Sequence, residues 1–180
     1  MPSLDHFALF DLPARFSIDL ADLEKRYLAL SRQLHPDRHA TAGAAQRLAS
    51  VQKTTDLNEA YRTLRDDFRR AEALLRRHGI ETSEDKAHDH RAAVDPSLLM
   101  EIMELREALQ DARGAHDVGA IAQLNADVEA RSDDAWTQIR AGFTALDEGD
   151  GSSLANITKL IISLRYYRRI LDEVADLEDA

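Results

Sequence analysis

The amino-acid sequence predicts an all-α protein made of two helical domains. Three observations favour this fold class. Apolar residues recur at helical spacing along most of the chain, Ala, Leu, Glu and Arg are abundant, and only seven Gly and four Pro occur in 180 residues. A polar stretch without periodicity divides the chain. We therefore expect a first domain at residues 1–79, a linker at 80–94 and a second domain at 95–180.

The first domain should be built around a helix from Leu20 to about Leu34. Asp19 suits its N-cap, and Pro36 prevents the helix from continuing, because proline lacks an amide hydrogen and disfavours the helical conformation of the residue before it. A short helix over residues 5–12 should precede it. The expected inward positions are Phe7, Leu9, Phe10 and Leu12 on the short helix and Leu20, Leu23, Tyr27, Leu30 and Leu34 on the longer one.

Two further helices should complete this domain. One is expected from about Ala44 to Arg65 and should pack antiparallel to the helix before it. The other should begin after Asp66 as N-cap and end near Gly79. Their predicted inward positions are Leu48, Val51, Leu57, Ala60, Tyr61 and Leu64, followed by Phe68, Ala71, Leu74 and Leu75.

The second domain should be an antiparallel three-helix bundle with short turns. Its helices are expected at 96–112, where Asp95-Pro96 is a start signal and Gly114 a stop, then from Asp117 to about Leu146, and from Leu154 to about Glu178. The predicted core positions are Leu98, Ile102, Leu105, Leu109, Ile121, Leu124, Val128, Ala135, Ile139, Phe143, Leu154, Ile157, Leu160, Ile161, Leu164, Ile170 (or Leu171), Val174 and Leu177.

Composition and charge exclude several classes of function. The chain has no Cys, which excludes disulfides, thiol catalysis and a metal or cluster held by its own thiolates. No stretch approaches the roughly 20 apolar residues of a membrane span, and the N-terminus lacks the features of a signal peptide, so we expect a bacterial cytoplasmic protein. The net charge of −10 divides into +2 over residues 1–80 and −12 over 81–180. This acidic balance argues against binding to duplex nucleic acid.

The motifs give little support to an enzyme. His35 and His39 have the spacing of metal ligands on a helix, but Pro36 interrupts that helix, and the run His88-Asp89-His90 could bind metal only adventitiously. No phosphate loop, nucleophile elbow or HExxH motif is present, so we expect no catalysis, no cofactor and no metal site.

Six arginines close together raise the alternative of nucleic-acid binding. They lie at positions 62, 65, 69, 70, 76 and 77 and are interleaved with acidic residues. Helix-face salt bridges explain them more simply than contacts with phosphates do.

The tripeptide His35-Pro36-Asp37 is the first candidate site. A helix that ends at a proline displays an imidazole and a carboxylate on a stiffened loop. Four basic residues lie nearby in the sequence: Lys25, Arg26, Arg32 and Arg38. This layout suits a protein contact better than a catalytic centre.

Together with its surroundings, the tripeptide resembles that of a J-domain, the co-chaperone module that activates DnaK-type chaperone ATPases. Tyr27 lies eight residues before it, and a loop and a second amphipathic helix follow. The resemblance implies that the tripeptide and the basic residues dock on the chaperone, that Asp37 pairs with a chaperone arginine, and that changing His35 or Asp37 abolishes stimulation. General J-domains place basic residues directly after the tyrosine. Here Leu28 and Ala29 follow it, which favours a dedicated chaperone partner.

The second candidate site lies on the predicted 96–112 helix. Leu99, Met100 and Met103 exceed what its core stripe requires and lie beside that stripe, with Glu104 and Glu107. Exposed apolar residues clustered on one helix usually mark an interaction surface, and Met suits a surface that must adapt to its partner.

The segment LLMEIMELREAL resembles the one with which HscB-type J-proteins of iron–sulfur cluster biogenesis contact the scaffold protein IscU. The later segment LRYYRRIL resembles their basic-aromatic region and adds Arg165 and Tyr166. The resemblance implies an L-shaped co-chaperone that binds an IscU-like scaffold and an HscA-like ATPase, with neither a membrane nor a nucleic acid as partner. The alternative is a J-protein that has a different client or serves a general DnaK-type chaperone.

Overall fold

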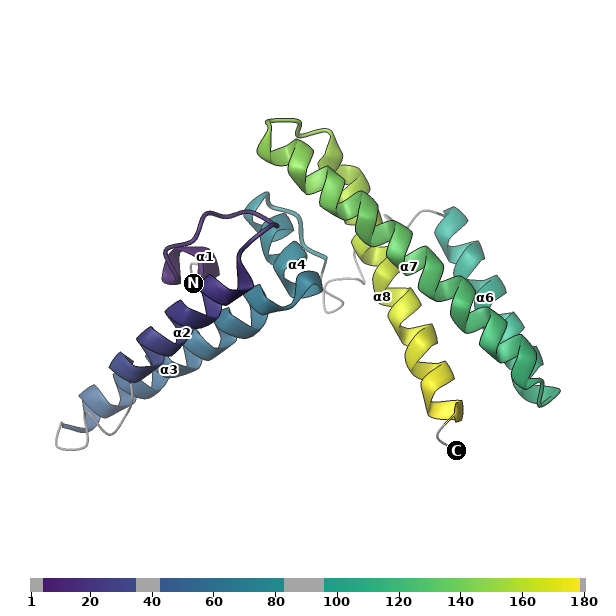
Figure 1. Cartoon of the computed structure of the whole chain (residues 1–180), viewed down its shortest axis with the longest axis horizontal. Helices are drawn as coiled ribbons and strands as arrows, with labels where there is room; N and C mark the ends of the chain where they lie inside the picture. Colours follow the sequence, from purple (N-terminus) through teal and green to yellow (C-terminus); the bar gives the residue numbers. More distant parts are fainter. Residues whose placement is uncertain (1–4, 35–42, 83–95, 179–180) are drawn as a thin grey trace. The chain divides into compact units, whose positions relative to one another are not determined.

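The structure is a computed structural model that describes residues 5–34, 43–82 and 96–178 (Figure 1). All regular secondary structure in these ranges is helical, which confirms the predicted all-α class. The chain divides into two compact units, Met1–Arg77 and His78–Ala180. Most of the predicted linker lies outside the described residues. Among the helices that are described, none is both long enough and apolar enough to cross a membrane.

The N-terminal unit contains a helical hairpin between two short helices. Its elements are α1 (His6–Leu9), α2 (Leu20–Leu34), α3 (Ala44–Arg65) and α4 (Asp67–Arg77). Figure 1 shows α2 and α3 side by side, and α1 contacts α3. The core of this unit combines aromatic residues from the N-terminal segment with aliphatic residues of the helices: Phe7, Phe10, Phe16, Leu23, Leu57, Ala60, Leu64, Ala71, Leu74 and Leu75.

The first helix is shorter than the predicted span of residues 5–12. Asp5 caps it by accepting hydrogen bonds from the amides of Phe7 and Ala8, at 3.1 and 3.2 Å. The helix ends early because Asp11 adopts a left-handed backbone with φ of 52°. The Leu12 amide then donates back to the Phe7 carbonyl at 3.0 Å, which closes the last turn before Pro13 is reached.

Side-chain contacts at two levels of the hairpin show that α2 and α3 run antiparallel. In the middle of α2, the Tyr27 hydroxyl donates to Asn58 Oδ1 at 3.0 Å, and its ring stacks on Tyr61 with centroids 4.1 Å apart. At the C-terminal end of α2, the Ser50 hydroxyl donates to the Leu34 carbonyl at 3.1 Å. That carbonyl belongs to the last turn of α2, where no amide of the same helix can reach it. α3 therefore caps the C-terminal end of α2.

Three residues predicted to face this core are exposed instead. Leu48 and Val51 on α3 are 72% and 54% exposed, and Leu20, the first residue of α2, is 47% exposed. The buried stripe of α3 continues back from Leu57 through Thr54 and Ser50, at the same helical spacing but with hydroxyl-bearing residues. The apolar pattern therefore placed the first turns of α3 on the wrong face.

The fourth helix is capped as predicted by Asp66, whose Oδ1 accepts from the Arg69 amide at 2.8 Å. Gly79, the residue predicted to end it, has φ of 78°, a left-handed conformation that glycine adopts without steric cost. The six arginines of this region do not behave uniformly. Arg70 and Arg77 pair with Asp67 and Asp5, whereas within the described residues the remaining four, at positions 62, 65, 69 and 76, form no salt bridge.

Arg70 is a core residue, only 5% exposed, and not part of a surface ion-pair ladder. Its Nε donates to the Phe16 carbonyl at 2.8 Å, Nη1 donates to the Leu64 carbonyl, and Nη2 pairs with Asp67. The guanidinium also lies 4.8 Å from the centroid of the Phe16 ring. A single side chain of α4 therefore holds the segment before α2 and the last turn of α3 in place.

The C-terminal unit is the predicted antiparallel three-helix bundle. It consists of α6 (Pro96–Gly114), α7 (Val118–Asp147) and α8 (Ser153–Glu178). α7 and α8 pack along much of their length, and α6 lies against both (Figure 1). Gly142 permits the close approach of α7 and α8, because a Cβ there would lie 2.8 Å from Ile157 Cγ1. The predicted cap Asp117 accepts from the Ala120 amide at 2.9 Å.

The predicted core of the bundle is largely confirmed. Most predicted positions are buried, while Ile121, Leu154, Leu160, Leu171 and Leu177 are half-buried. Two details differ from the prediction. Gly114 is the last residue of α6, and the left-handed turn residue is His116, with φ of 52°. In addition, Tyr167 is buried although the apolar pattern left it out.

We predict that Arg70→Met destabilises the N-terminal unit by about 3 kcal/mol, because the carbonyls of Phe16 and Leu64 lose buried charged donors. Amide hydrogen exchange in α3 and α4 of the full-length protein measures this loss. Arg69→Met, at an exposed neighbour, is the matched control and should change stability by less than about 0.5 kcal/mol. Equal protection in the two variants would contradict the role given to Arg70.

Candidate functional site

The outer face of α6 carries a cluster of exposed apolar side chains. Leu99 is 43% exposed, Met100 63% and Met103 70%. They stand clear of the bundle because Leu98, Ile102, Leu105 and Leu109 form the buried stripe of the same helix. Glu104 and Glu107 are also exposed. We call Leu99, Met100, Met103, Glu104 and Glu107 the α6 patch.

The geometry of the α6 patch follows from helical spacing and matches the sequence prediction. Positions 99, 103 and 107 form one row on the helix surface, and positions 100 and 104 lie in the neighbouring row. Two unbranched thioethers and a leucine thus lie beside two carboxylates. The surface suits a partner that is apolar at its centre and basic at its edge.

A polar cluster beside the buried stripe ties α6 to both other helices. Glu101, which lies between Met100 and Met103 in the helix, is half-buried. Its Oε1 accepts a hydrogen bond from the Tyr167 hydroxyl of α8 at 2.7 Å, and another from Arg131 Nη1 of α7. One carboxylate oxygen of α6 thus accepts hydrogen bonds from both α7 and α8. These bonds limit rotation of α6 about its own axis and help to keep the patch facing outward.

The ionisation of this cluster is consistent with a fixed structural role. Burial, followed by the hydrogen bond to Glu101, raises the pKa of Tyr167 to about 12, and the nearby Arg131 guanidinium only partly opposes this. The hydrogen bond to Glu101 likewise raises the pKa of Arg131. At neutral pH the phenol therefore remains a donor and the guanidinium remains charged. The cluster gives no signal in the sequence, because Arg131 and Tyr167 lie 30 and 66 residues from Glu101.

Arg165 and Tyr166, predicted to border the same surface, are half-buried on α8. They precede Tyr167 directly in the chain. The Arg169 guanidinium lies 6.0 Å from the centroid of the Tyr166 ring, at the outer limit of a cation–π contact. Their membership of the α6 patch stays a prediction.

The other candidate site is only partly described. His35, Pro36, Asp37 and Arg38 lie outside the described residues. On α2, Lys25 and Arg32 are exposed and available to a partner surface. The described part of this site is therefore the exposed basic side of α2, which leads directly to the tripeptide.

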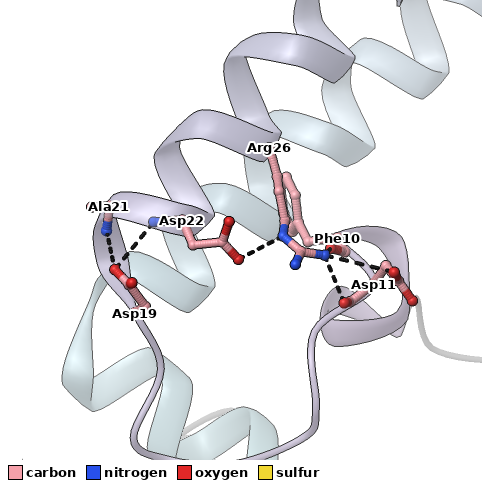
Figure 2. A network of polar contacts seen from close by, with 6 residues as sticks. All are labelled: Phe10, Asp11, Asp19, Ala21, Asp22 and Arg26. Atoms are coloured by element: carbon pink, nitrogen blue, oxygen red, sulfur yellow. Dashed lines mark hydrogen bonds and ion pairs between the residues drawn. The ribbon is translucent and has the colours of Figure 1, made fainter.

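Arg26 differs from the other basic residues of α2, because it is bound within the unit (Figure 2). Its Nε donates to Asp22 Oδ2 at 2.7 Å, and its Nη1 donates to the carbonyls of Phe10 and Asp11 at 2.9 and 2.8 Å. Arg26 thereby joins α2 to the turn that ends α1. These internal partners explain why a guanidinium is needed at this position. A contribution of Arg26 to docking stays a prediction.

The beginning of α2 is held in the same region (Figure 2). As predicted, Asp19 caps the helix: its Oδ1 accepts from the amides of Ala21 and Asp22, at 2.9 and 3.2 Å. With Arg26 holding the first turns and Ser50 the last carbonyl, α2 is fixed at both ends before the tripeptide begins.

Several histidines of the sequence have a spacing that could suit a metal ion. His35 and His39, and the run His88-Asp89-His90, all lie outside the described residues. Within residues 5–34, 43–82 and 96–178, no group of three or more His, Asp or Glu side chains is placed to hold a metal ion.

Comparisons with known proteins agree with this arrangement of helices. Two solved co-chaperone structures share the fold. The chaperone HscB from Vibrio cholerae has a TM-score of 0.77 and 33% identity over 98% of each chain. The human co-chaperone protein HscB has a TM-score of 0.79 and 27% identity, over 99% of this chain and 84% of the human one. The fold and its similarity to these structures thus define a helical co-chaperone.

The sequence comparisons narrow the class to one family. The family model described as the HSCB C-terminal oligomerisation domain matches residues 94–175. A co-chaperone protein HscB homolog of Burkholderia multivorans is 38% identical over 169 residues, which cover 94% of this chain and 91% of the relative. The chain belongs to the HscB family of co-chaperones.

We predict that Tyr167→Phe destabilises the C-terminal unit by about 1–2 kcal/mol, because it removes a part-buried hydrogen bond to a carboxylate. Urea unfolding monitored through Trp136, the single tryptophan of the chain and a residue of α7, measures the loss. Tyr166→Phe removes the hydroxyl of the half-buried neighbour and should leave the midpoint nearly unchanged. If the two variants lowered the urea midpoint equally, the hydrogen bond from Tyr167 to Glu101 would have no specific role in stabilising the bundle.

Proposed function

We propose that this protein stimulates the ATPase of a dedicated DnaK-type chaperone, similar to HscA, and delivers an IscU-like iron–sulfur scaffold protein to it in the bacterial cytoplasm. Membership of the HscB co-chaperone family supports the general assignment. The observation that carries the delivery role is the exposure of Leu99, Met100 and Met103 on a helix whose core stripe is already complete.

In this proposal the protein carries out no chemistry of its own. The N-terminal unit docks on one state of the chaperone more tightly than on the other and so shifts the population toward the state that hydrolyses ATP. A coupling free energy of about 1–3 kcal/mol changes the relevant equilibrium by roughly 5–150-fold. Lys25 and Arg32 on α2 would steer the approach to an acidic chaperone surface, and the tripeptide His35-Pro36-Asp37 would make the specific contact.

The α6 patch supplies the other half of the proposed activity. Burying Leu99, Met100 and Met103 in a complementary surface removes apolar area from water, and each fully covered side chain contributes about 1.5–3 kcal/mol. Glu104 and Glu107 would pair with basic groups at the edge of the scaffold protein. Because cargo and chaperone are then held by one chain, the cargo reaches the chaperone at a raised effective concentration.

We predict that Leu99→Ala and Met103→Ala each weaken binding of a purified IscU-like scaffold about tenfold, because each removes apolar surface from the centre of the interface. Isothermal titration calorimetry measures the affinity. Val118→Ala is the matched control, since Val118 is another exposed apolar residue, at the start of α7. Unchanged affinity in both patch variants would move the cargo site elsewhere, and no complex with the native protein would indicate a different client.

We predict that Asp37→Asn abolishes the stimulation of steady-state ATP turnover by an HscA-like chaperone, because the proposed contact to a chaperone arginine requires a carboxylate. The same variant should bind the scaffold with native affinity, which shows that the C-terminal unit is intact, and native amide hydrogen exchange in α2 and α3 controls for folding of the N-terminal unit. Turnover measured with a panel of DnaK-type chaperones identifies the partner. Full stimulation by the variant would refute the docking role of the tripeptide.

A further inference from the structure

The oxidisable sulfur of this protein is concentrated on one surface. The chain contains three Met and no Cys. Apart from Met1, which begins the chain, the methionines are Met100 and Met103, and both belong to the α6 patch. Among the described residues, the buried hydrophobic positions of both units are Ala, Val, Leu, Ile, Phe and Tyr, so no buried thioether supports either core.

The exposure of the two thioethers sets their reactivity. Met100 is 63% exposed and Met103 70%, so dissolved oxidants reach both sulfur atoms. Met is readily oxidised to the sulfoxide, which is polar and chiral, and sulfoxide reductases reverse the reaction. The same exposure means that oxidation leaves the cores of the described structure intact and changes only the surface.

We propose that Met100 and Met103 form a reversible oxidation switch that turns off cargo binding at the α6 patch. Hydrogen peroxide transfers one oxygen atom to each thioether. The O–O bond breaks, an S–O bond forms, water leaves, and the sulfur loses two electrons while the peroxide is reduced. A methionine sulfoxide reductase returns the two electrons from a thiol reductant and releases the oxygen as water. The oxidation itself is independent of the proposed function, whereas its effect on cargo rests on it.

The effect on binding follows from the geometry of the patch. A sulfoxide oxygen would have to lose its water where the surrounding surface, including Leu99, is apolar, and it finds no hydrogen-bond donor on Glu104 or Glu107. The unoxidised side chains gain from burial in the same place. Oxidation of both methionines should therefore weaken scaffold binding by about tenfold or more, and reduction should restore it.

The test uses the full-length protein treated with hydrogen peroxide. Peptide mass spectrometry should locate one added oxygen on each of Met100 and Met103, and helical circular dichroism should remain unchanged. Binding of a purified IscU-like scaffold should fall and then recover after treatment with both epimer-specific sulfoxide reductases. The control is the double variant Met100→Leu with Met103→Leu, which keeps the apolar surface and Met1. Whatever affinity the two leucines leave, that affinity should be the same before and after treatment with hydrogen peroxide.

The outcomes separate the switch from the proposed function. If the two methionines acquire oxygen and native affinity persists, the switch is refuted while the cargo site stands. If they resist conditions that oxidise a free methionine peptide, the switch is also refuted. If the untreated protein binds no scaffold, the cargo assignment fails and the switch with it, whatever the mass spectra show. Equal loss of binding in the leucine variant would place the sensitive group elsewhere.

Discussion

The one-sided packing of α6 is the constraint on which the proposed cargo surface, the α6 patch, depends. This helix is attached to α7 and α8 through a single stripe, Leu98, Ile102, Leu105 and Leu109. A helix in that position buries the stripe and leaves the opposite face to water. The stripe sets which residues face outward, and the hydrogen bonds of the Glu101 cluster limit rotation of the helix away from that orientation. Apolar residues on that face are therefore available to a partner without any opening of the bundle.

In the N-terminal unit, positive charge has two separate uses. Arg70 and Arg26 donate mainly to backbone carbonyls of segments that lack regular hydrogen-bond partners, next to Phe16 and at the end of α1. Lys25 and Arg32 point to solvent and can interact with another protein. Internal hydrogen bonds stabilise the fold, whereas exposed charges are free to contact a partner. Net charge alone does not distinguish these two uses. Only the local geometry assigns each residue to one of them.

Periodicity predicted the helices well, since most observed boundaries fall within a few residues of the expected ones. It failed at Leu48 and Val51, because the buried face of α3 continues through Ser50 and Thr54, whose hydroxyls serve the end of α2. It also overextended α1, because the left-handed turn at Asp11 has no strong residue signal. Asp is less typical than Gly at such a position.

For the candidate site too, some residues could be predicted from the sequence and others could not. The exposed residues of the α6 patch were predictable, because a helix needs one stripe for its core and the surplus apolar residues must lie elsewhere. Tyr167, Arg131 and Arg70 could not be recognised, because their partners are distant in sequence and the hydrogen bonds depend on how helices cross. Each unit has a hydrophobic core of its own. Evolution can therefore exchange residues of the α6 patch, the proposed cargo surface, without repacking the core of the N-terminal unit.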